Sequence, residues 1–135
     1  MKAPDTISPA LSGVSETLFY ALYLRAIESQ RPDALLKDEK AVALVTLIDY
    51  DFSRFKYIEF DKVALVMRTR EFDRYARDFL AKYPEAVVVH IGCGLDTRFE
   101  RVDNGKVEWY DLDLPEVIEL RRKRIGGEGE RYHFL

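Results

Sequence analysis

The chain has 135 residues, of which 47% are hydrophobic and 33% are charged, and its formal net charge is −3. This length favours one domain, and the apolar fraction is sufficient for a buried core. The slightly acidic balance excludes a broad basic surface for nucleic acid, and no apolar stretch is long enough to cross a membrane. A single cysteine, Cys93, excludes an internal disulfide. We therefore expect a soluble, cytoplasmic protein without a nucleic-acid or membrane partner.

The first part of the chain, residues 1–83, predicts helices. Ser12 or Ser15 can cap a first helix, which should stop just before Pro32. Asp38 can cap a second helix, which carries apolar residues as far as Ile48.

The segment 49–60 is aromatic and acidic without a clear period, so we interpret it as a loop. Asp61 can then cap a long third helix that extends to about Lys82. The apolar residues of this helix recur at helical spacing and should form its buried side: Val63, Met67, Phe72, Tyr75, Ala76, Phe79 and Tyr83.

The second part, residues 84–135, alternates between strand and helix patterns in the manner of an α/β fold. The β-branched run 87–91 has no polar alternation, which suits a strand covered on both faces in a parallel sheet. A glycine loop and a short helix follow, and the segment 107–110 reads as a second strand. Pro115 suits the first turn of the next helix, and residues 131–135 resemble a third strand.

The glycine loop and the acids after the second strand predict a nucleoside-binding half-site. Gly92 and Gly94 allow a sharp turn and a close approach of bare backbone to a ligand. Asp111 and Asp113 follow Gly94 by 17 and 19 residues, near the offset of about 20 at which a Rossmann-type acid reaches a ribose hydroxyl. The loop therefore predicts a ribose-containing ligand.

The same loop lacks the third glycine of a dinucleotide site, because Thr97 stands there. Asp96 lies where the next helix should begin, so its carboxylate would repel a pyrophosphate. S-adenosylmethionine has the same ribose but carries cationic sulfonium and ammonium groups. An acidic loop favours that cofactor.

Simpler structural roles compete for the same acids. Asp96 could be only the N-cap of the short helix. Asp111 or Asp113 could cap the helix that begins at Pro115, with the other acid binding ribose.

The remaining polar residues favour structural roles. Cys93 is interpreted as a small residue between two glycines, and His90 and His133 as core or rim residues. The basic run 121–124 should complement the dipole at a helix C-terminus. No spacing typical of a metal site occurs in the chain.

Four motifs resemble the leucine carboxyl methyltransferase family, in particular its bacterial branch that includes polyketide O-methyltransferases. They are V-V-V-H-I-G-C-G-L-D-T-R from Val87, W-Y-D-L-D-L-P-E-V-I from Trp109, S-E-T at Ser15 and M-R-T-R-E-F-D at Met67. The resemblance covers almost the whole chain. It implies an α/β fold, namely a partial Rossmann-like class I methyltransferase sheet preceded by an N-terminal helical region that covers the cofactor.

The resemblance also implies methyl transfer from S-adenosylmethionine to a carboxylate or hydroxyl oxygen of a small molecule or peptide. The counterpart of Arg68 lies beside the cofactor's carboxylate and the acceptor, the glycine loop cradles the methionine part, and the counterpart of Asp113 approaches the ribose. No catalytic base is evident. The residues expected to bind the cofactor are Arg68, Gly92, Cys93, Gly94, Asp96, Asp111, Leu112 and Asp113.

Family members continue beyond the third strand, so residues 84–135 would be only the first part of the cofactor domain. The strand 87–91 should then present an open edge that pairs in a homodimer or with a complementing chain. Two other functions compete with the enzyme. One is a non-catalytic cofactor-binding or interaction fragment, and the other is a nucleotide-dependent oxidoreductase or epimerase.

Overall fold

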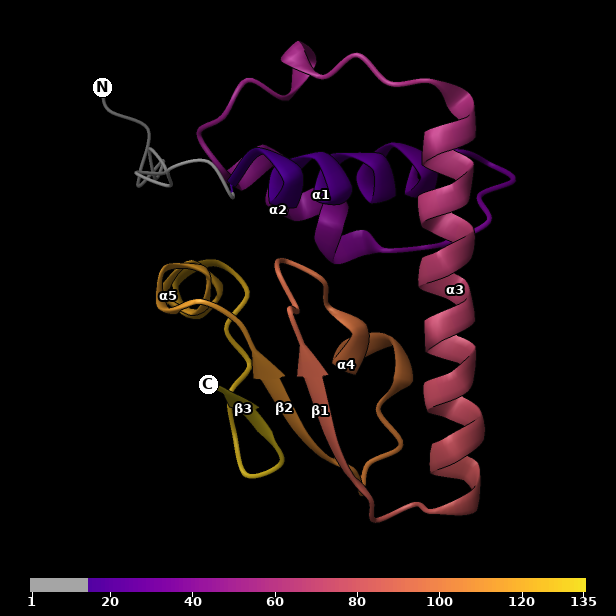
Figure 1. Cartoon of the computed structure of the whole chain (residues 1–135), viewed down its shortest axis with the longest axis vertical. Coiled ribbons are helices and arrows are strands. Elements are labelled where there is room, and N and C mark those ends of the chain that lie inside the picture. The colour runs from indigo at the N-terminus through magenta and orange to yellow at the C-terminus, as the bar shows by residue number, and fades with distance from the viewer. Residues whose placement is uncertain (1–14) are drawn as a thin grey trace. The chain divides into compact units, whose positions relative to one another are not determined.

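The computed structural model describes residues 15–135, so the predicted cap at Ser12 lies outside it. The elements in chain order are α1 (Ser15–Ser29), α2 (Glu39–Leu47), the 3-10 helix η1 (Phe52–Arg54), α3 (Glu59–Lys82), β1 (Val87–Ile91), α4 (Arg98–Val102), β2 (Glu108–Leu112), α5 (Pro115–Arg124) and β3 (Tyr132–Phe134) (Figure 1). This order confirms the predicted α/β fold with helices first and a parallel sheet after them. None of the helices in residues 15–135 has the length and apolar character needed to cross a membrane. The chain forms two compact units that divide within α3, between Val66 and Met67.

In the first unit, a buried carboxylate joins α1 to α2. The Asp38 Oδ1 atom accepts a hydrogen bond from the Ala41 amide at 3.0 Å, which confirms the predicted cap of α2. Its other oxygen lies 3.2 Å from the Arg25 Nε atom, and its amide donates to the Ser29 hydroxyl at 2.8 Å. The cap is therefore also the contact that fixes the loop between the two helices.

The segment interpreted as a loop contains one short helical turn and an aromatic cluster. Phe52 is buried in η1, and its ring lies 5.8 Å from the rings of Phe19 and Tyr23 on α1. The Tyr50 ring lies 4.8 Å from that of Phe19. Aromatic packing thus orders a segment that has no periodic pattern in the sequence.

The long helix α3 differs from the prediction in its start and in its buried side. It begins at Glu59, so Asp61 lies in the first turn and does not cap it. The predicted apolar side is about half exposed at five positions, with exposed fractions from 46% to 55% at Met67, Phe72, Tyr75, Phe79 and Tyr83. Two charged residues, Lys62 and Asp73, are buried instead, together with Val66, Thr69 and Leu80.

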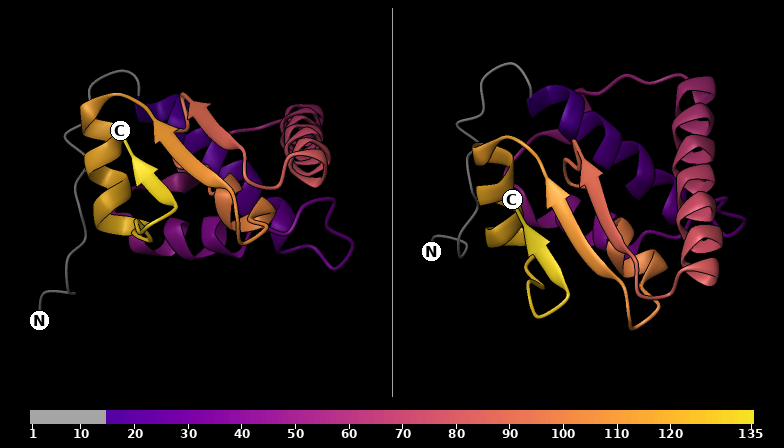
Figure 2. Two further views of the ribbon diagram at one scale, coloured as in Figure 1. Left: turned by 90° about the horizontal axis from the view of Figure 1, so that it is seen from below. Right: turned by 60° about the horizontal axis from the view of Figure 1, so that its bottom comes forward.

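The second unit is built on a parallel sheet in the order β1-β2-β3 (Figure 2). Val88 of β1 pairs with Trp109 of β2, which pairs with Tyr132 of β3. One face of the sheet is covered by both short helices, because Phe99 of α4 stacks on Tyr132 at 4.1 Å and Arg121 of α5 lies over the Phe134 ring. The core of this unit lies between that face and those helices.

The opposite face of the sheet is open. Val87, Val89 and Ile91 are 60%, 51% and 76% exposed, so the prediction that β1 is covered on both faces is wrong for this chain. The physical reason is that α4 and α5 both contact the same face. Since β1 is also the first strand in the sheet order, it presents both an apolar face and an unpaired edge.

The ion pair between Lys62 and Glu28 predicts a large cost for removing either charge. The Lys62 Nζ atom lies 3.1 Å from the Glu28 carboxylate, and both side chains are almost inaccessible to solvent. We expect Lys62→Met to lower the free energy of unfolding by about 3 kcal/mol, because the buried Glu28 carboxylate then keeps only the more distant Arg31, at 3.5 Å, as a cationic partner. Urea unfolding measures this loss. Lys56→Met, at an exposed lysine, is the matched control, and equal small effects of the two variants would contradict the prediction.

Candidate functional site

The glycine loop and Asp113 meet at the carboxyl edge of the sheet. The amides of Gly92 and Cys93 both donate to the Leu112 carbonyl, at 2.8 and 3.2 Å. The Gly94 amide donates to the Asp113 carboxylate at 2.7 Å. Two segments that are 19 residues apart in the sequence are thus joined directly, as the predicted half-site requires.

The two glycines adopt backbone conformations that other residues rarely adopt. The φ angles are +65° at Gly92 and +53° at Gly94. A side chain built at Gly92 would meet nothing within 4 Å, so the space beside this residue is open. The loop therefore leaves room for a ligand to approach bare backbone.

The loop offers few free amides to a phosphate. The amides of Gly92, Cys93, Gly94 and Asp96 all donate to acceptors within the chain. The helix that follows has only five residues, and its N-cap is Thr97, so the alternative prediction that Asp96 caps it is wrong. A phosphate-binding loop needs several unpaired amides that point at the ligand. This geometry disfavours a dinucleotide.

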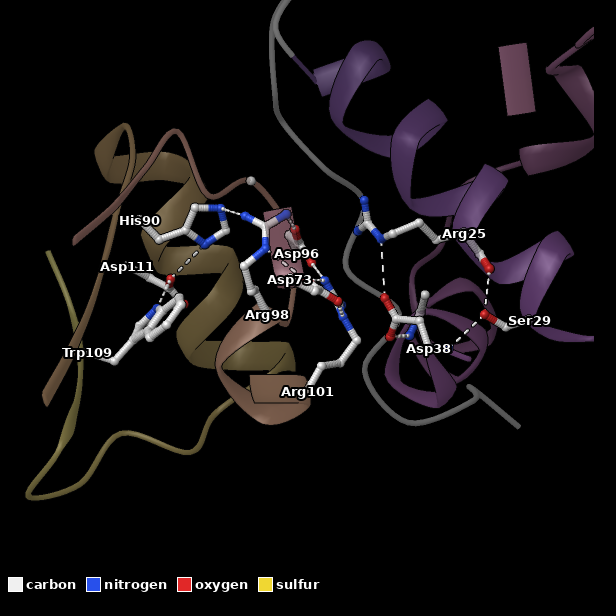
Figure 3. Close-up of polar contacts among 12 residues, drawn as sticks. Arg25, Ser29, Asp38, Asp73, His90, Asp96, Arg98, Arg101, Trp109 and Asp111 are labelled. Atoms are coloured by element: carbon white, nitrogen blue, oxygen red, sulfur yellow. Dashed lines mark hydrogen bonds and ion pairs between the residues drawn. The ribbon is translucent and has the colours of Figure 1, made fainter. Parts of the chain in front are cut away.

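The Asp96 carboxylate is held by two arginines (Figure 3). Arg98 and Arg101 approach it at 3.0 and 2.8 Å, and both also bind Asp73 of α3, at 2.8 and 2.7 Å. The two negative charges of the carboxylates are therefore balanced by the two positive charges of the guanidinium groups. Because the charge of Asp96 is compensated, the predicted repulsion of a pyrophosphate by this residue is weaker than the sequence suggests.

Asp111 is completely buried on the covered face of the sheet. One of its oxygens accepts from the Trp109 indole at 2.9 Å and lies 3.2 Å from the His90 Nδ1 atom. The other accepts from the side chains of Arg121 and Tyr132. All four acceptor positions of the carboxylate are therefore used by protein groups.

The surroundings of Asp111 also fix its ionisation and the tautomer of His90. Burial by itself would raise the pKa of Asp111, but the hydrogen bond from His90 and the charge of Arg121 hold it below its ordinary value. The Arg98 Nη1 atom lies 2.9 Å from the His90 Nε2 atom and can only donate. His90 therefore accepts at Nε2 and donates from Nδ1 to Asp111.

Arg121 departs from its expected role. The sequence predicts that residues 121–124 are cations at a helix C-terminus, and all four lie in the last turn of α5. Arg121, however, is fully buried, and it donates to the carbonyl oxygens of Gly94 and Asp96 at 2.8 Å each. The sequence does not single out this residue, because a run of four basic residues does not indicate which one is buried.

The remaining predicted residues surround this arrangement. Asp113 is partly exposed and also accepts from the Leu114 amide at 2.7 Å, while Leu112 is exposed. Leu114 is the N-cap residue of α5, so the alternative prediction that Asp111 or Asp113 caps this helix is wrong. Cys93 is buried, and burial raises the pKa of its thiol to about 12.

Arg68 is exposed on α3. The hydrogen bonds and ion pairs described above for the glycine loop do not involve Arg68. Asp73, from the same motif, does reach the loop through the arginines of α4. The G-L-D-T-R motif contains Arg98, but nothing in the sequence indicates that Asp73 of α3 is its partner.

Comparison with known proteins gives the family. Residues 19–133 match the family described as leucine carboxyl methyltransferase. The chain belongs to this family. The match includes the glycine loop, Asp111 in β2, Asp113 after it and the helix that carries Asp73.

Two relatives illustrate the match. The chain is 44% identical over 126 residues to the tetracenomycin polyketide synthesis O-methyltransferase TcmP of Streptomyces glaucescens. The aligned segment covers 93% of the chain and 46% of that protein. The chain is 34% identical over 124 residues to an S-adenosyl-L-methionine-dependent methyltransferase of Gibberella zeae, covering 84% of the chain and 41% of that protein. The chain thus spans under half the length of these family members. No solved structure matches it significantly.

The buried carboxylate predicts a pH-dependent contribution to stability. Because the pKa of Asp111 is lowered in the folded chain, its contribution is present above the unfolded value of about 3.9 and is lost as the pH falls further. We expect Asp111→Asn to cost about 3 kcal/mol at pH 7, since it leaves Arg121 buried without its counter-ion. The difference in the free energy of unfolding between this variant and the unsubstituted chain should shrink below about pH 4. Chemical unfolding at several pH values measures it.

Asp103→Asn is the control for this experiment, because Asp103 forms a partly exposed pair with Arg131. We expect this substitution to cost less than about 1 kcal/mol. Equal losses for the two variants would contradict the role given to Asp111.

Proposed function

We propose that the complete protein is an S-adenosylmethionine-dependent O-methyltransferase that acts on a carboxylate or hydroxyl oxygen of a small molecule or peptide. The observation that carries the proposal is the 2.7 Å hydrogen bond from the Gly94 amide to the Asp113 carboxylate. It joins the loop and the acid at the edge where nucleoside ligands bind in open parallel sheets. Family membership supports the reaction class, and the name of the Streptomyces relative supports oxygen as the acceptor atom.

The residues present fit this cofactor. Open space beside Gly92 suits a ligand that passes close to the backbone. We propose that Asp113 receives the ribose hydroxyls, because it is partly exposed, whereas Asp111 is buried and fully bonded. The amides of the loop donate within the chain, which suits a ligand without phosphates. When bound, S-adenosylmethionine supplies the activated methyl group.

A carboxylate acceptor is the better of the two chemical alternatives. A carboxylate is already anionic, whereas a hydroxyl acceptor must lose a proton to a base. Asp96 and Asp111 are held in ion pairs, Asp113 is assigned to the ribose, and burial raises the pKa of the Cys93 thiol to about 12. We therefore propose that the chain aligns a carboxylate acceptor, with Arg68 as its contact.

We also propose a division of the chain into two regions. Residues 1–83 form a helical cap region, and the cofactor domain begins at residue 84.

The proposal predicts a clear preference among nucleoside ligands. Calorimetric titration of the chain should show binding of S-adenosylmethionine or S-adenosylhomocysteine and much weaker binding of NAD, because the amides of Gly92, Cys93, Gly94 and Asp96 already donate within the chain. Asp113→Ala should weaken the binding by at least about tenfold, since a charge-assisted hydrogen bond contributes about 1.5–3 kcal/mol.

Asp103→Ala is the matched control for the binding experiment, because it removes an acid from the turn that follows α4. We expect it to leave the affinity unchanged. Tight binding of NAD would instead favour the oxidoreductase alternative, and unchanged affinity in Asp113→Ala would remove this residue from the site.

A second function is favoured by the open edge of the sheet. β1 pairs only with β2 among the described strands, and its exposed side chains are apolar. An unpaired apolar edge strand is a template for another strand. We propose that the edge pairs with a second copy of the chain or with a chain that carries further strands. The chain alone would then be a cofactor-binding or interaction module that is inactive until it is completed.

The edge predicts self-association. At micromolar concentration, sedimentation of the 15.7 kDa chain should show a dimer or larger species. Val87→Lys should shift the distribution toward monomer, because a charge on an edge strand opposes pairing. Ile58→Lys is the control, since Ile58 is similarly exposed at 62% but lies outside the sheet. A monodisperse monomer of the unsubstituted chain would show that the edge does not mediate association.

A further inference from the structure

In the second unit, the buried side chain of Arg121 contacts both the glycine loop and the sheet. The Arg121 side chain is 0% exposed. Its Nη1 atom donates to the carbonyl oxygens of Gly94 and Asp96, at 2.8 Å each. Its Nη2 atom donates to the Asp111 carboxylate and, at 2.8 Å, to the Tyr132 hydroxyl. One guanidinium therefore links the loop after β1 to the strands β2 and β3.

The ion pair alone does not explain this arrangement. A buried ion pair contributes little net stability compared with apolar residues of similar size, because both charges lose their hydration. The two carbonyl bonds are a separate feature, since they require the planar, multi-donor geometry of arginine. A lysine could keep the charge next to Asp111, but its compact ammonium group lacks the planar fork that reaches two carbonyl groups and the carboxylate together.

The loop is held from a second side by other arginines. The Asp96 carbonyl is bound by Arg121, while the Asp96 carboxylate is bound by Arg98 and Arg101. His90 connects the two sides, because its ring lies between Asp111 and Arg98. The residue that ends the turn is thus fixed at its backbone and at its side chain.

These bonds determine what the loop presents to a ligand. The carbonyls of Gly94 and Asp96 point toward Arg121, and the amides of Gly92 and Cys93 point toward the Leu112 carbonyl. The conformation of the loop is therefore held by hydrogen bonds within the chain. A ligand that binds a preformed loop avoids the entropy cost of ordering it.

We propose that Arg121 is a positioning residue for the cofactor, which acts by fixing the conformation of the Gly92–Asp96 loop through its two carbonyl hydrogen bonds. This proposal rests on the proposed function, because it assigns the preformed loop to S-adenosylmethionine. Arg121 itself is buried beneath the loop and does not contact the ligand.

The test uses the whole chain and the variant Arg121→Lys, with Arg122→Lys as the matched control. Arg122 is adjacent on α5, and its side chain is 52% exposed. In Arg121→Lys, we expect the backbone amides of residues 92–96 to exchange hydrogen about tenfold faster, while those of β2 are unchanged. The affinity for S-adenosylhomocysteine should fall about tenfold, and that for adenosine should fall much less. A general loss of structure would instead weaken both ligands and speed exchange throughout the unit.

A measurement on the unsubstituted chain keeps the test decisive if the variant does not fold. Without ligand, the amides of residues 92–96 should already exchange as slowly as those of the strands, because the loop is preformed. Fast exchange there would overturn the proposal, as would unchanged affinity and unchanged loop exchange in Arg121→Lys. If the loop is protected but the unsubstituted chain binds no S-adenosylhomocysteine, the proposed function fails, and the role of Arg121 toward the cofactor fails with it.

Discussion

In the second unit, the carboxylate of Asp111 lies where solvent does not reach it, and four side chains from four elements donate to it. His90 comes from β1, Trp109 from β2, Tyr132 from β3 and Arg121 from α5. A buried charge is tolerable only when its acceptor positions are filled, so these four elements must come together in one register for the unit to fold. The glycine loop depends on the same contact, because Arg121 reaches the loop and the carboxylate at once.

The first unit follows the same principle with different residues. Its helices bury Asp38 against Arg25 and Glu28 against Lys62. Burial alone would raise the pKa of Glu28, but the Leu35 amide and the Lys62 ammonium group hold it below its ordinary value. Such pairs contribute more to the choice of one packing arrangement than to net stability. In both units, charged residues specify which helix face lies inside.

The exposed apolar residues are concentrated on β1 and along α3. Val87, Val89 and Ile91 lie on the open face of the sheet, and Phe72 and Phe79 are about half exposed on α3. Apolar surface of this kind, together with an unpaired strand edge, is typical of an interface. The described chain also spans under half the length of its relatives. The unit thus combines a glycine loop held by bonds within the chain with a sheet that is covered on one side only.

The sequence by itself determined the class of fold, the glycine loop, the cap at Asp38, the proline at the start of α5 and the family. These features depend on local backbone preferences and on motifs with fixed spacing, which a linear pattern contains. Only the tertiary structure decided which of two acids is buried, because Asp111 and Asp113 are two residues apart and occupy opposite environments. It also decided that α3 buries Lys62 and Asp73 while its aromatic side stays exposed, and that Arg121 alone of the four basic residues is fully buried. In each case the outcome depends on a partner far away in the sequence, and periodicity records the spacing of residues but not the identity of their partners.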